Sequence, residues 1–318
     1  MSDGPLVIQA ENLDERCADW LGERCELIRC SKDNDNFRAH LAVAHGLVIR
    51  SYTEIDGDFL DAGKNLRVIG RAGVGLDHVD LKACKERGVR VVHTPGANTQ
   101  AVAELVFAML LDVVRPRVFL HKSIVDLKAW KQARIQLTGE RELGSLTLGV
   151  LGFGRIGSRV AQIAKAFGMH VIYHDVREIP EEERLGARPV SRDELFQRSD
   201  IVSIHVDGSH TNARIVRADE FALMKDNVVF INTSRGLVVD PFACASFMIE
   251  HPAACAMLDV HDPEPFDATY PLLDIKNVYL TPHLGGATRS ASLAMSWVVR
   301  DVWAVLQGNE PENEADYD

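Results

Sequence analysis

Three segments in the last third of the chain contain residue types that together can move a proton beside a carboxylic acid. Arg235 lies in INTSRG, Glu264 in DPEP and His283 in TPHLGG, and each segment follows a predicted strand. Arginine offers a planar, permanently charged fork that binds a carboxylate and polarises an adjacent carbonyl. Histidine changes charge near neutral pH, and a neighbouring glutamate holds its ring in one tautomer and favours the protonated form. Because ligands of open α/β sheets bind outside the carboxyl ends of the strands, we expect the three side chains to converge on one crevice.

Each of these residues also has a simpler structural interpretation. The chain has 12 histidines, and a single one at a strand end is often structural or exposed. Arg235 can be a surface charge, and Glu264, between two prolines, can be a loop carboxylate. The joint chemical interpretation is favoured by a glycine-rich motif that lies upstream.

That motif is LTLGVLGFGRIGSRVA (146–161), a sequence typical of a strand, a tight turn and a helix. Gly152, Gly154 and Gly157 have the GxGxxG spacing of dinucleotide-binding turns. The first permits the turn, the second lets the backbone approach a pyrophosphate, and the third allows close helix–strand packing. The N–H groups at the start of the helix then face the phosphates. The alternative is a turn that only reverses the chain.

A carboxylate at the expected distance supports the cofactor-binding interpretation. The next predicted strand, HVIYHD, ends in Asp175, 18 residues after Gly157. There it can accept hydrogen bonds from both ribose hydroxyls of NAD, and it would repel the 2′-phosphate of NADP. Arg177 can partly offset this repulsion, so the sequence favours NAD without excluding NADP.

A second glycine-rich turn, GRAGVGLDHVD (70–80), also follows a predicted strand and precedes a helix. We expect free backbone N–H groups from Ala72 to Val74, which could cradle an anion such as a substrate carboxylate. A simple turn between strand and helix is an equally good interpretation of this segment alone.

The elements that must position these residues form two series of short β-branched runs, each run followed by a helical pattern. The first series of predicted strands comprises 6–10, 26–30, 47–51, 67–72 and 89–94. The second comprises 146–152, 170–175, 200–206, 227–233, 253–260 and 277–283. This alternation predicts an α/β protein with two doubly wound parallel sheets.

Helical patterns separate and follow the two series. A long helical section is predicted over about 99–135, and a terminal helix over 290–308. Because this last helix has no strand of its own to pair with, we expect it to return to the first domain. The acidic tail, 309–318, has almost no apolar residues, and we expect it to be frayed.

Composition excludes several classes of protein. The 318 residues are 46% hydrophobic and 25% charged, which is too apolar for a disordered chain and too charged for a membrane protein. The net charge of −11 argues against general binding to nucleic acid or anionic lipid. Six scattered cysteines without CxxC spacing give no support for a metal site and suit a reduced, cytoplasmic protein. No signal peptide is visible, and the longest apolar run, 101–114, is too short to span a bilayer.

Together these motifs resemble those of the D-isomer-specific 2-hydroxyacid dehydrogenases, in order and spacing, from about residue 45 to 290. GRAGVGLDHVD resembles the family's substrate-carboxylate loop, TPGANTQAVAE the entry to its interdomain helix, and LGVLGFGRIG its nucleotide fingerprint. Arg235, Glu264 and His283 fall on the family's Arg–Glu–His positions, at intervals of 29 and 19 residues. The nearest branch is similar to phosphoglycerate dehydrogenase, in a short form without an appended regulatory domain.

The resemblance implies a Rossmann nucleotide domain, 97–287, inserted into a flavodoxin-like substrate domain formed by 1–96 and 288–318. It also implies lobe closure around the substrate and a homodimer with the 99–135 region as the contact. Asp259 falls on the carboxylate that contacts the nicotinamide carboxamide. The cofactor contacts it implies are Val74, Gly152, Gly154, Arg155, Ile156, Gly157, Asp175, Val206, Thr233, Asp259 and Gly286. The substrate contacts are Arg50, Ala72, Gly73, Val74, Arg235 and His283.

Three positions depart from the family pattern. HVDGSHTN (205–212) lacks the proline usual in the turn near the adenine, which puts the shape of that wall in question. Tyr52 stands where phosphoglycerate enzymes tend to carry a second cation, which weakens the case for a phosphorylated substrate. His261 replaces the aromatic residue usual after LDV.

The sequence therefore predicts an NAD-dependent oxidoreductase that interconverts a D-2-hydroxy acid and its 2-oxo acid. Glyoxylate, hydroxypyruvate, phosphohydroxypyruvate and bulkier 2-oxo acids share the handle that Arg235 would bind. The alternative from another class is an NAD(H)-sensing binding protein or corepressor of the same fold, although the catalytic trio is complete. Formate oxidation is a weaker alternative, because family members with that activity carry Gln at the position of Glu264.

Overall fold

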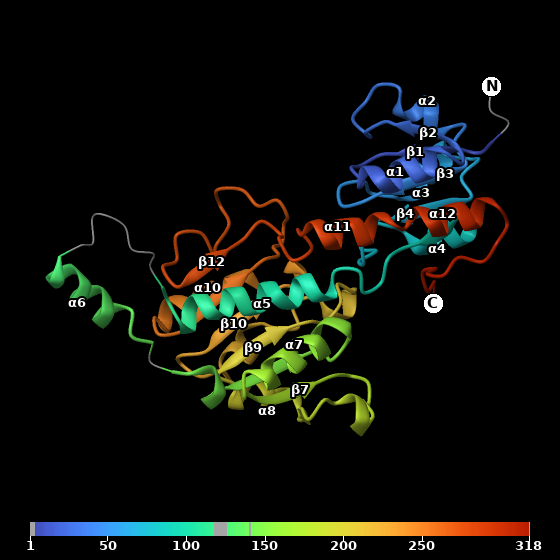
Figure 1. Ribbon diagram of the computed structural model, residues 1–318. Coiled ribbons are helices and arrows are strands. Elements are labelled where there is room, and N and C mark those ends of the chain that lie inside the picture. Colours follow the sequence, from blue (N-terminus) through green and yellow to red (C-terminus); the bar gives the residue numbers. More distant parts are fainter. Residues whose placement is uncertain (1–3, 118–125, 140, 318) are drawn as a thin grey trace. The chain divides into compact units, whose positions relative to one another are not determined.

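The chain divides into two compact units. In the computed structural model, which describes residues 4–117, 126–139 and 141–317, the smaller unit comprises Met1–Asn98 and Gly286–Asp318. The larger unit comprises Thr99–Gly285. The chain thus leaves the smaller unit once, completes the larger unit, and returns (Figure 1). The units divide at 98/99 and 285/286, where the sequence analysis expected 96/97 and 287/288.

The smaller unit is built on a five-stranded parallel sheet with the order β2-β1-β3-β4-β5, the flavodoxin-like order. Its strands are β1 (Leu6–Gln9), β2 (Glu26–Arg29), β3 (Gly46–Ile49), β4 (Val68–Arg71) and β5 (Arg90–Val92). The side chains of successive residues in a strand point to opposite faces of the sheet and so pack in different core clusters. Ile8 packs in the cluster on one face of the sheet, and Val7 packs in the cluster on the other. The short apolar runs are therefore buried on both faces, as a parallel sheet requires.

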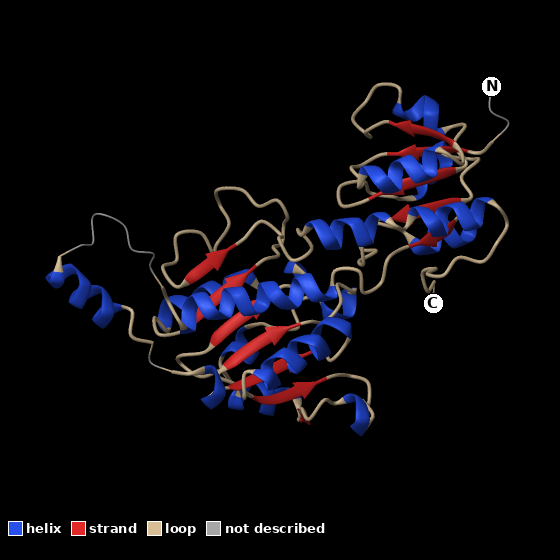
Figure 2. Ribbon diagram, viewed as in Figure 1, coloured by secondary structure: helices blue, strands red, loops and turns tan. Residues whose placement is uncertain are grey.

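Helices cover both faces of this sheet (Figure 2). They are α1 (Glu15–Gly22), α2 (Phe37–Leu41), α3 (Gly57–Ala62), α4 (Leu81–Glu86), α11 (Arg289–Ser296) and α12 (Val299–Leu306). Asp14, Asp56 and Asp80 cap α1, α3 and α4 by accepting backbone N–H groups of the first turn. The helix α12 packs so closely on β4 that a Cβ added at Gly70 would lie 2.3 Å from Val302. The chain's last helices thus complete the core of its first domain.

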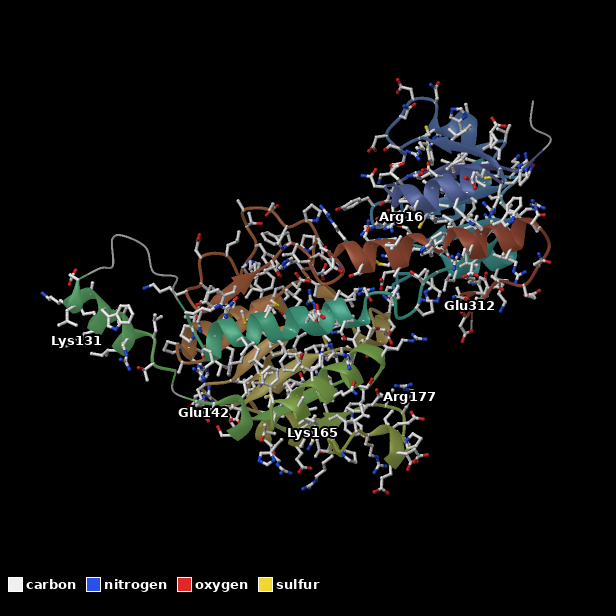
Figure 3. All side chains as sticks on the ribbon, viewed as in Figure 1. Arg16, Lys131, Glu142, Lys165, Arg177 and Glu312 are labelled. Atoms are coloured by element: carbon white, nitrogen blue, oxygen red, sulfur yellow. The ribbon has the colours of Figure 1, made fainter. Side chains whose placement is uncertain are left out.

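The acidic tail is ordered, contrary to the expectation of fraying. Ala315 donates its N–H to the Val91 carbonyl at 2.8 Å, and Glu314 forms an antiparallel bridge with Val92. Arg90 forms ion pairs with Glu310 and Glu314. Composition misled the prediction because the tail is held by backbone pairing with the edge strand β5, by ion pairs, and by Ala315 and Tyr317, which pack on the core of the smaller unit. Figure 3 labels Glu312 within this tail.

The larger unit contains a seven-stranded parallel sheet with the order β12-β11-β10-β9-β6-β7-β8. Counted from β6, this is the Rossmann order 3-2-1-4-5-6 with one further strand at the edge. The strands are β6 (Thr147–Leu151), β7 (His170–His174), β8 (Arg188–Pro189), β9 (Ile201–Ile204), β10 (Val229–Asn232), β11 (Cys255–Leu258) and β12 (Val278–Leu280). The two-residue strand β8 was not predicted, because it is too short to carry a pattern.

Except for α6, which has no buried residue, the α-helices of the larger unit contribute side chains to two core clusters, one on each face of the sheet. The α-helices are α5 (Thr99–Val114), α6 (Leu127–Gln136), α7 (Arg155–Ala166), α8 (Arg192–Arg198), α9 (Ala218–Phe221) and α10 (Pro241–Glu250). Single 3₁₀ turns are η1 (Leu143–Ser145), η2 (Glu181–Glu183), η3 (His210–Asn212) and η4 (Gly236–Val238). None of the described helices is both long and apolar enough to cross a membrane.

Two predicted helices prove to be pairs. The section expected over 99–135 ends at Val114, before Arg115 and Pro116, and a second helix begins at Leu127; residues 118–125 lie outside the described part. A proline disfavours helical backbone at the residue before it, here Arg115, which explains why α5 ends at Val114. The terminal helix expected over 290–308 is divided between α11 and α12 at Trp297 and Val298.

Candidate active site

His283 and Glu264 form a direct pair. The Nδ1 atom of His283 lies 2.5 Å from Oε1 of Glu264. The two residues follow β12 and β11, and Arg235 follows β10, so the three segments leave the carboxyl ends of three neighbouring strands. With Nδ1 bonded to the carboxylate, the Nε2 atom of the ring is left to exchange a proton with a bound molecule. Both side chains are partly exposed, at 48% for His283 and 37% for Glu264.

The electrostatics of Glu264 favour its ionised form. Burial alone would raise its pKa, but the hydrogen bond and charge of His283 outweigh burial and hold the pKa below the usual value. The backbone N–H of His261 adds a second donor, 3.3 Å from Oε2. Glu264 is therefore an anion at neutral pH, and an anion next to the ring stabilises the imidazolium.

The backbone holds His283 in an unusual conformation. Its φ is +55°, in the left-handed region that residues with a Cβ rarely adopt. The segment is fixed by Asp259, which is fully buried and accepts hydrogen bonds from the N–H groups of Leu284 and Gly285, both at 2.7 Å, and from the Thr281 hydroxyl at 2.5 Å. The resemblance assigns Asp259 to the cofactor carboxamide. The structure gives it this anchoring role on the His283 segment, which the spacing alone did not predict.

The Arg235 turn is organised by a residue that the sequence analysis missed. Asn232 is buried, donates its side-chain amide to the Arg235 carbonyl at 2.9 Å, and accepts from the Ser234 N–H at 3.0 Å. The next residue, Gly236, lies against His261, where an added Cβ would come within 1.9 Å of the His261 carbonyl. Only glycine fits there, and this contact joins the turn that carries Arg235 to the segment that leads to Glu264. The signal available in sequence was the polar Asn at the end of an apolar strand.

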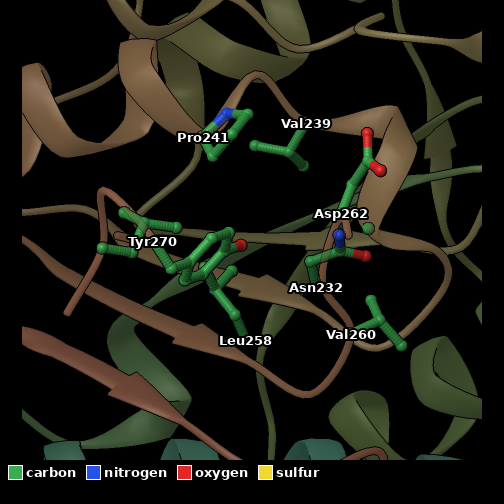
Figure 4. Close-up of a pocket in the computed structure, with 9 residues that line it drawn as sticks. Asn232, Val239, Pro241, Leu258, Val260, Asp262 and Tyr270 are labelled. Carbon is green, nitrogen blue, oxygen red and sulfur yellow. The ribbon is translucent and has the colours of Figure 1, made fainter. Parts of the chain in front are cut away.

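A pocket of about 230 Å³ of empty space, part of it open to solvent, lies between these two segments (Figure 4). Asn232 and Val239 line it from the side of β10, and Val260 and Asp262 from the side of β11. Tyr270 closes another part of its wall, and burial raises the pKa of this tyrosine to about 12, so it is neutral.

The glycine-rich turn after β6 has the geometry that a dinucleotide requires. Gly152 has φ +89°, and a Cβ there would lie 2.8 Å from the His205 carbonyl. A Cβ at Gly157 would lie 2.0 Å from the Gly152 oxygen, so the helix α7 packs directly on the turn. Nothing lies within 4 Å of a Cβ at Gly154, which leaves this side open to a ligand. Gly154 has no side chain to cap α7, so the N–H groups of Arg155 and Ile156 can face phosphates.

Asp175 stands directly after β7, with only 8% of its side chain exposed. It accepts the Phe153 N–H at 2.7 Å, the Arg177 N–H at 2.9 Å, and the Arg177 guanidinium at 3.2 Å from Nε. Burial would raise its pKa, but these donors outweigh burial and lower the pKa below the usual value. The structure thus links Asp175 both to the glycine-rich turn and to Arg177, which Figure 3 labels.

The remaining expected cofactor residues occupy separate places. Val206 follows β9, and its N–H lies 2.9 Å from the position of a Cβ on Gly152. Thr233 follows β10, and its buried hydroxyl has no hydrogen-bond partner among the described residues. Gly286 belongs to the smaller unit. Burial lowers the pKa of His205 to about 3, so this histidine is neutral.

The expected anion cradle of the smaller unit is only partly available. Ala72 donates its N–H to the Ile49 carbonyl, and Gly73 donates to the Arg71 carbonyl, both at 2.8 Å. Two of the three N–H groups that we expected to be free therefore have backbone partners. Ala72 continues the ladder between β4 and β3, and Gly73 bonds back to Arg71 within the turn itself. Arg50, which follows β3, donates to the Ser292 hydroxyl at 3.2 Å.

The fold and this site define a class: a doubly wound α/β protein with a glycine-rich turn of dinucleotide-binding geometry and a hydrogen-bonded His–Glu pair after two strands of the same sheet. A model of the "D-isomer specific 2-hydroxyacid dehydrogenase, NAD binding domain" matches residues 107–285. The hydroxypyruvate reductase of Thermotoga maritima is 40% identical over 247 residues, which are 77% of this chain and 79% of that protein. The D-3-phosphoglycerate dehydrogenase of Archaeoglobus fulgidus is 33% identical over 93% of this chain, which spans 56% of that protein.

A solved structure gives the same relationship. The D-lactate dehydrogenase of Aquifex aeolicus, determined with NAD and lactic acid, superposes with a TM-score of 0.81, at 28% identity and 96% coverage of both chains. The chain belongs to the D-isomer-specific 2-hydroxyacid dehydrogenase family and is an NAD-dependent oxidoreductase. The NAD-binding domain is in the larger unit, around the glycine-rich turn. Among the described residues, no cluster of three or more His, Cys, Asp or Glu side chains could hold a metal ion.

Proposed function

We propose that this protein interconverts a D-2-hydroxy acid and its 2-oxo acid, with Arg235, Glu264 and His283 as the catalytic residues. The observation that carries the proposal is the 2.5 Å pair between His283 and Glu264. Glu264 follows β11 and His283 follows β12, and both strands belong to the sheet in which the glycine-rich turn follows β6. An ionised carboxylate on Nδ1 prepares the ring to hold and release a proton at Nε2, which reduction of a carbonyl requires.

The residues of the larger unit divide the work. NAD, when bound, supplies the chemistry of hydride transfer to or from C2 of the substrate. Arg235 would bind the carboxylate and polarise the adjacent carbonyl through its guanidinium. In reduction, His283 would give its Nε2 proton to the carbonyl oxygen, and Glu264 stabilises the imidazolium before that step. In oxidation, His283 would accept the hydroxyl proton at the same atom, so that protons balance in both directions.

The residues around the glycine-rich turn suit the cofactor by their geometry. The N–H groups at the start of α7 would bind the pyrophosphate, since Gly154 leaves the approach open. Asp175 would accept hydrogen bonds from the ribose hydroxyls. Its carboxylate already binds Arg177, so a ribose must share or displace that guanidinium. Val206 and Thr233 would line the cofactor from the ends of β9 and β10.

Recognition of the acid would fall partly to the loops of the smaller unit that contain Arg50 and residues 72–74. The N–H of Val74 is the member of this turn best suited to an anion, because those of Ala72 and Gly73 already have acceptors. The relatives named above are a hydroxypyruvate reductase and a D-3-phosphoglycerate dehydrogenase. Tyr52, which stands where phosphoglycerate enzymes tend to carry a second cation, favours an unphosphorylated 2-oxo acid. We therefore propose substrates such as hydroxypyruvate or glyoxylate.

We also propose that the chain forms a homodimer through the region of α5 and α6. No residue of α6 is buried, and its apolar Leu127, Trp130 and Ile135 side chains are exposed by 69%, 46% and 75%. An exposed apolar helix of this kind is typical of a surface that is covered by a partner. Light scattering coupled to size-exclusion chromatography should give the mass of two chains. The variant W130E should lower the measured mass toward that of one chain.

The central experiment measures NADH oxidation by the purified protein with a panel of 2-oxo acids. Turnover of at least one small acid is expected, with NADH binding followed separately by its fluorescence. Tight NADH binding without turnover of any acid would instead favour an NAD(H)-sensing protein of the same fold. A stereospecific assay of the product determines whether the D-isomer, as expected, or the L-isomer is formed.

A further inference from the structure

The smaller sheet has its own topological switch point, where the direction of its connections reverses. In the order β2-β1-β3-β4-β5, the chain leaves β1 toward one edge of the sheet and β3 toward the other. Ligands of open α/β sheets bind at such switch points, outside the carboxyl ends of the strands. The two segments that emerge there contain Glu11, after β1, and Arg50–Thr53, after β3.

Glu11 fills this point with a fully engaged carboxylate. Its Oε2 accepts the Ser51 N–H at 2.7 Å, and its Oε1 accepts the Thr53 N–H at 3.0 Å and the Thr53 hydroxyl at 2.9 Å. The Tyr52 N–H lies between both oxygens, at 3.1 and 3.2 Å. Three successive backbone N–H groups thus point at one carboxylate, in the arrangement of an anion-binding nest.

The charge of Glu11 is maintained by these donors. Burial would raise the pKa of Glu11, but the hydrogen bonds from the loop backbone and from Thr53 outweigh burial and lower the pKa below the usual value. The backbone of Glu11 is itself fixed, because Gln9 donates its side-chain amide to the Glu11 carbonyl at 3.1 Å. A hydrogen bond to an ionised group is stronger than a neutral one, so this carboxylate holds the loop firmly.

The same loop is connected to the second glycine-rich turn. The N–H of Ile55 donates to the His78 carbonyl, and the Asp80 N–H donates to the Ile55 carbonyl, both at 2.8 Å. Glu11 therefore fixes the start of a segment whose end is paired with His78 and Asp80 of that turn. Within this frame the Tyr52 side chain remains 77% exposed, while its backbone is held. The loop thus presents the Tyr52 side chain to solvent from a fixed backbone.

We propose that Glu11 is a positioning residue for substrate selection: it sets the conformation of the 50–53 loop, and so the placement of Arg50 and Tyr52 toward the acid's side chain. This inference rests on the proposed function, since it assigns the loop to recognition of the 2-oxo acid. Glu11 itself takes no part in proton transfer. Its loss should therefore change the binding of the acid and leave the chemical step intact.

The kinetic test compares Glu11→Ala and Glu11→Gln with Glu54→Gln, which removes the same charge from an exposed position of the same loop. E11A is expected to raise KM for the best 2-oxo acid about ten- to hundredfold, with kcat within about twofold. E11Q keeps one acceptor oxygen and should give a KM between those of the wild type and E11A. If E11A does not fold, the KM of E11Q alone tests the proposal. E54Q should match the wild type, and NADH affinity should be the same in all four proteins.

Hydrogen exchange supplies a readout that needs no substrate. In E11A, the amides of residues 51–53 should exchange at least tenfold faster than in the wild type, while those of β6 keep their rates. Unchanged KM in E11A and E11Q overturns the proposal, whether or not exchange accelerates, and so does a fall in kcat at constant KM. A wild type that turns over no 2-oxo acid removes the proposed function together with this inference. An active wild type with an unaffected E11A removes this inference alone.

Discussion

The two sheets present different kinds of contact at their carboxyl ends. In the larger unit, side chains that can do chemistry fix one another, as His283 and Glu264 do. In the smaller unit, a carboxylate accepts hydrogen bonds from backbone N–H groups, as Glu11 does from the 51–53 loop. The difference indicates a division of labour within one chain: the larger unit holds reactive groups, and the smaller unit holds a loop in a defined shape.

The two glycine-rich turns differ in the same way. At Gly157 an added Cβ would strike backbone, the Gly152 oxygen at 2.0 Å, whereas the atoms nearest to a Cβ at Gly73 belong to the Arg71 side chain. The first turn leaves helix N–H groups uncapped at Gly154, and the second uses the N–H groups of Ala72 and Gly73 internally. Glycine content therefore does not define a phosphate site. Uncapped donors and close backbone packing do.

The largest expected effect lies in the reactive pair. H283A should lower kcat for reduction by roughly 10² to 10⁴, the usual contribution of general acid catalysis, with NADH affinity unchanged. The control is His170→Asn, at the start of β7 and thus at the other end of the sheet, which should keep full turnover. Steady-state kinetics and NADH fluorescence measure both. Full activity of H283A would contradict the assignment of His283.

The next effect separates the two turns. G154A has space for its Cβ, so its free energy of unfolding should change by less than about 1 kcal/mol, while NADH affinity falls about tenfold or more because the methyl group enters the ligand's approach. G73A should leave NADH affinity unchanged. Denaturant unfolding and NADH titration measure the two quantities. Equal loss of NADH affinity in both variants would mean that the turns do not differ in role.

Cofactor choice is expected to change at Asp175. D175N should weaken NADH about tenfold through the loss of a charged acceptor, and should strengthen NADPH because Arg177 is released toward a 2′-phosphate. The double variant D175N/R177Q should lose the gain for NADPH. Direct titration with both cofactors measures the ratio. A gain for NADPH that persists without Arg177 would show that repulsion by Asp175 is the whole effect.

The smallest effect concerns the tail on β5. The hydrogen bond from Arg90 outweighs burial and lowers the pKa of Glu314 below the usual carboxyl value of 4.5. A lowered carboxyl pKa stabilises the fold above that value, and the stabilisation is lost as the pH falls through the lowered pKa. R90Q should therefore be less stable by about 1 kcal/mol at pH 7, and equal to the wild type at strongly acidic pH. Urea unfolding at both pH values measures this, with Arg29→Gln, in an exposed ion pair, as the control.

Much of the fold could be predicted because parallel strands and helix caps leave local signals. The order of β-branched runs indicated both sheets, and GxGxxG followed by Asp175 indicated the cofactor domain. Contacts between distant segments could not be predicted. No local pattern shows that Asp259 anchors Leu284 and Gly285, that Asn232 holds Arg235, or that an acidic tail pairs with Val91. These depend on which strands are neighbours and on how their loops meet.

The left-handed backbone of His283 has a consequence for evolution and engineering. Such a conformation costs a residue with a Cβ about 1 kcal/mol or more, and asparagine or glycine adopts it more easily. If His283 has the proposed catalytic role, selection for heat resistance alone should enrich Asn or Gly at position 283 at the expense of turnover. The imidazole would then be kept by selection for turnover, so the position would trade stability for activity.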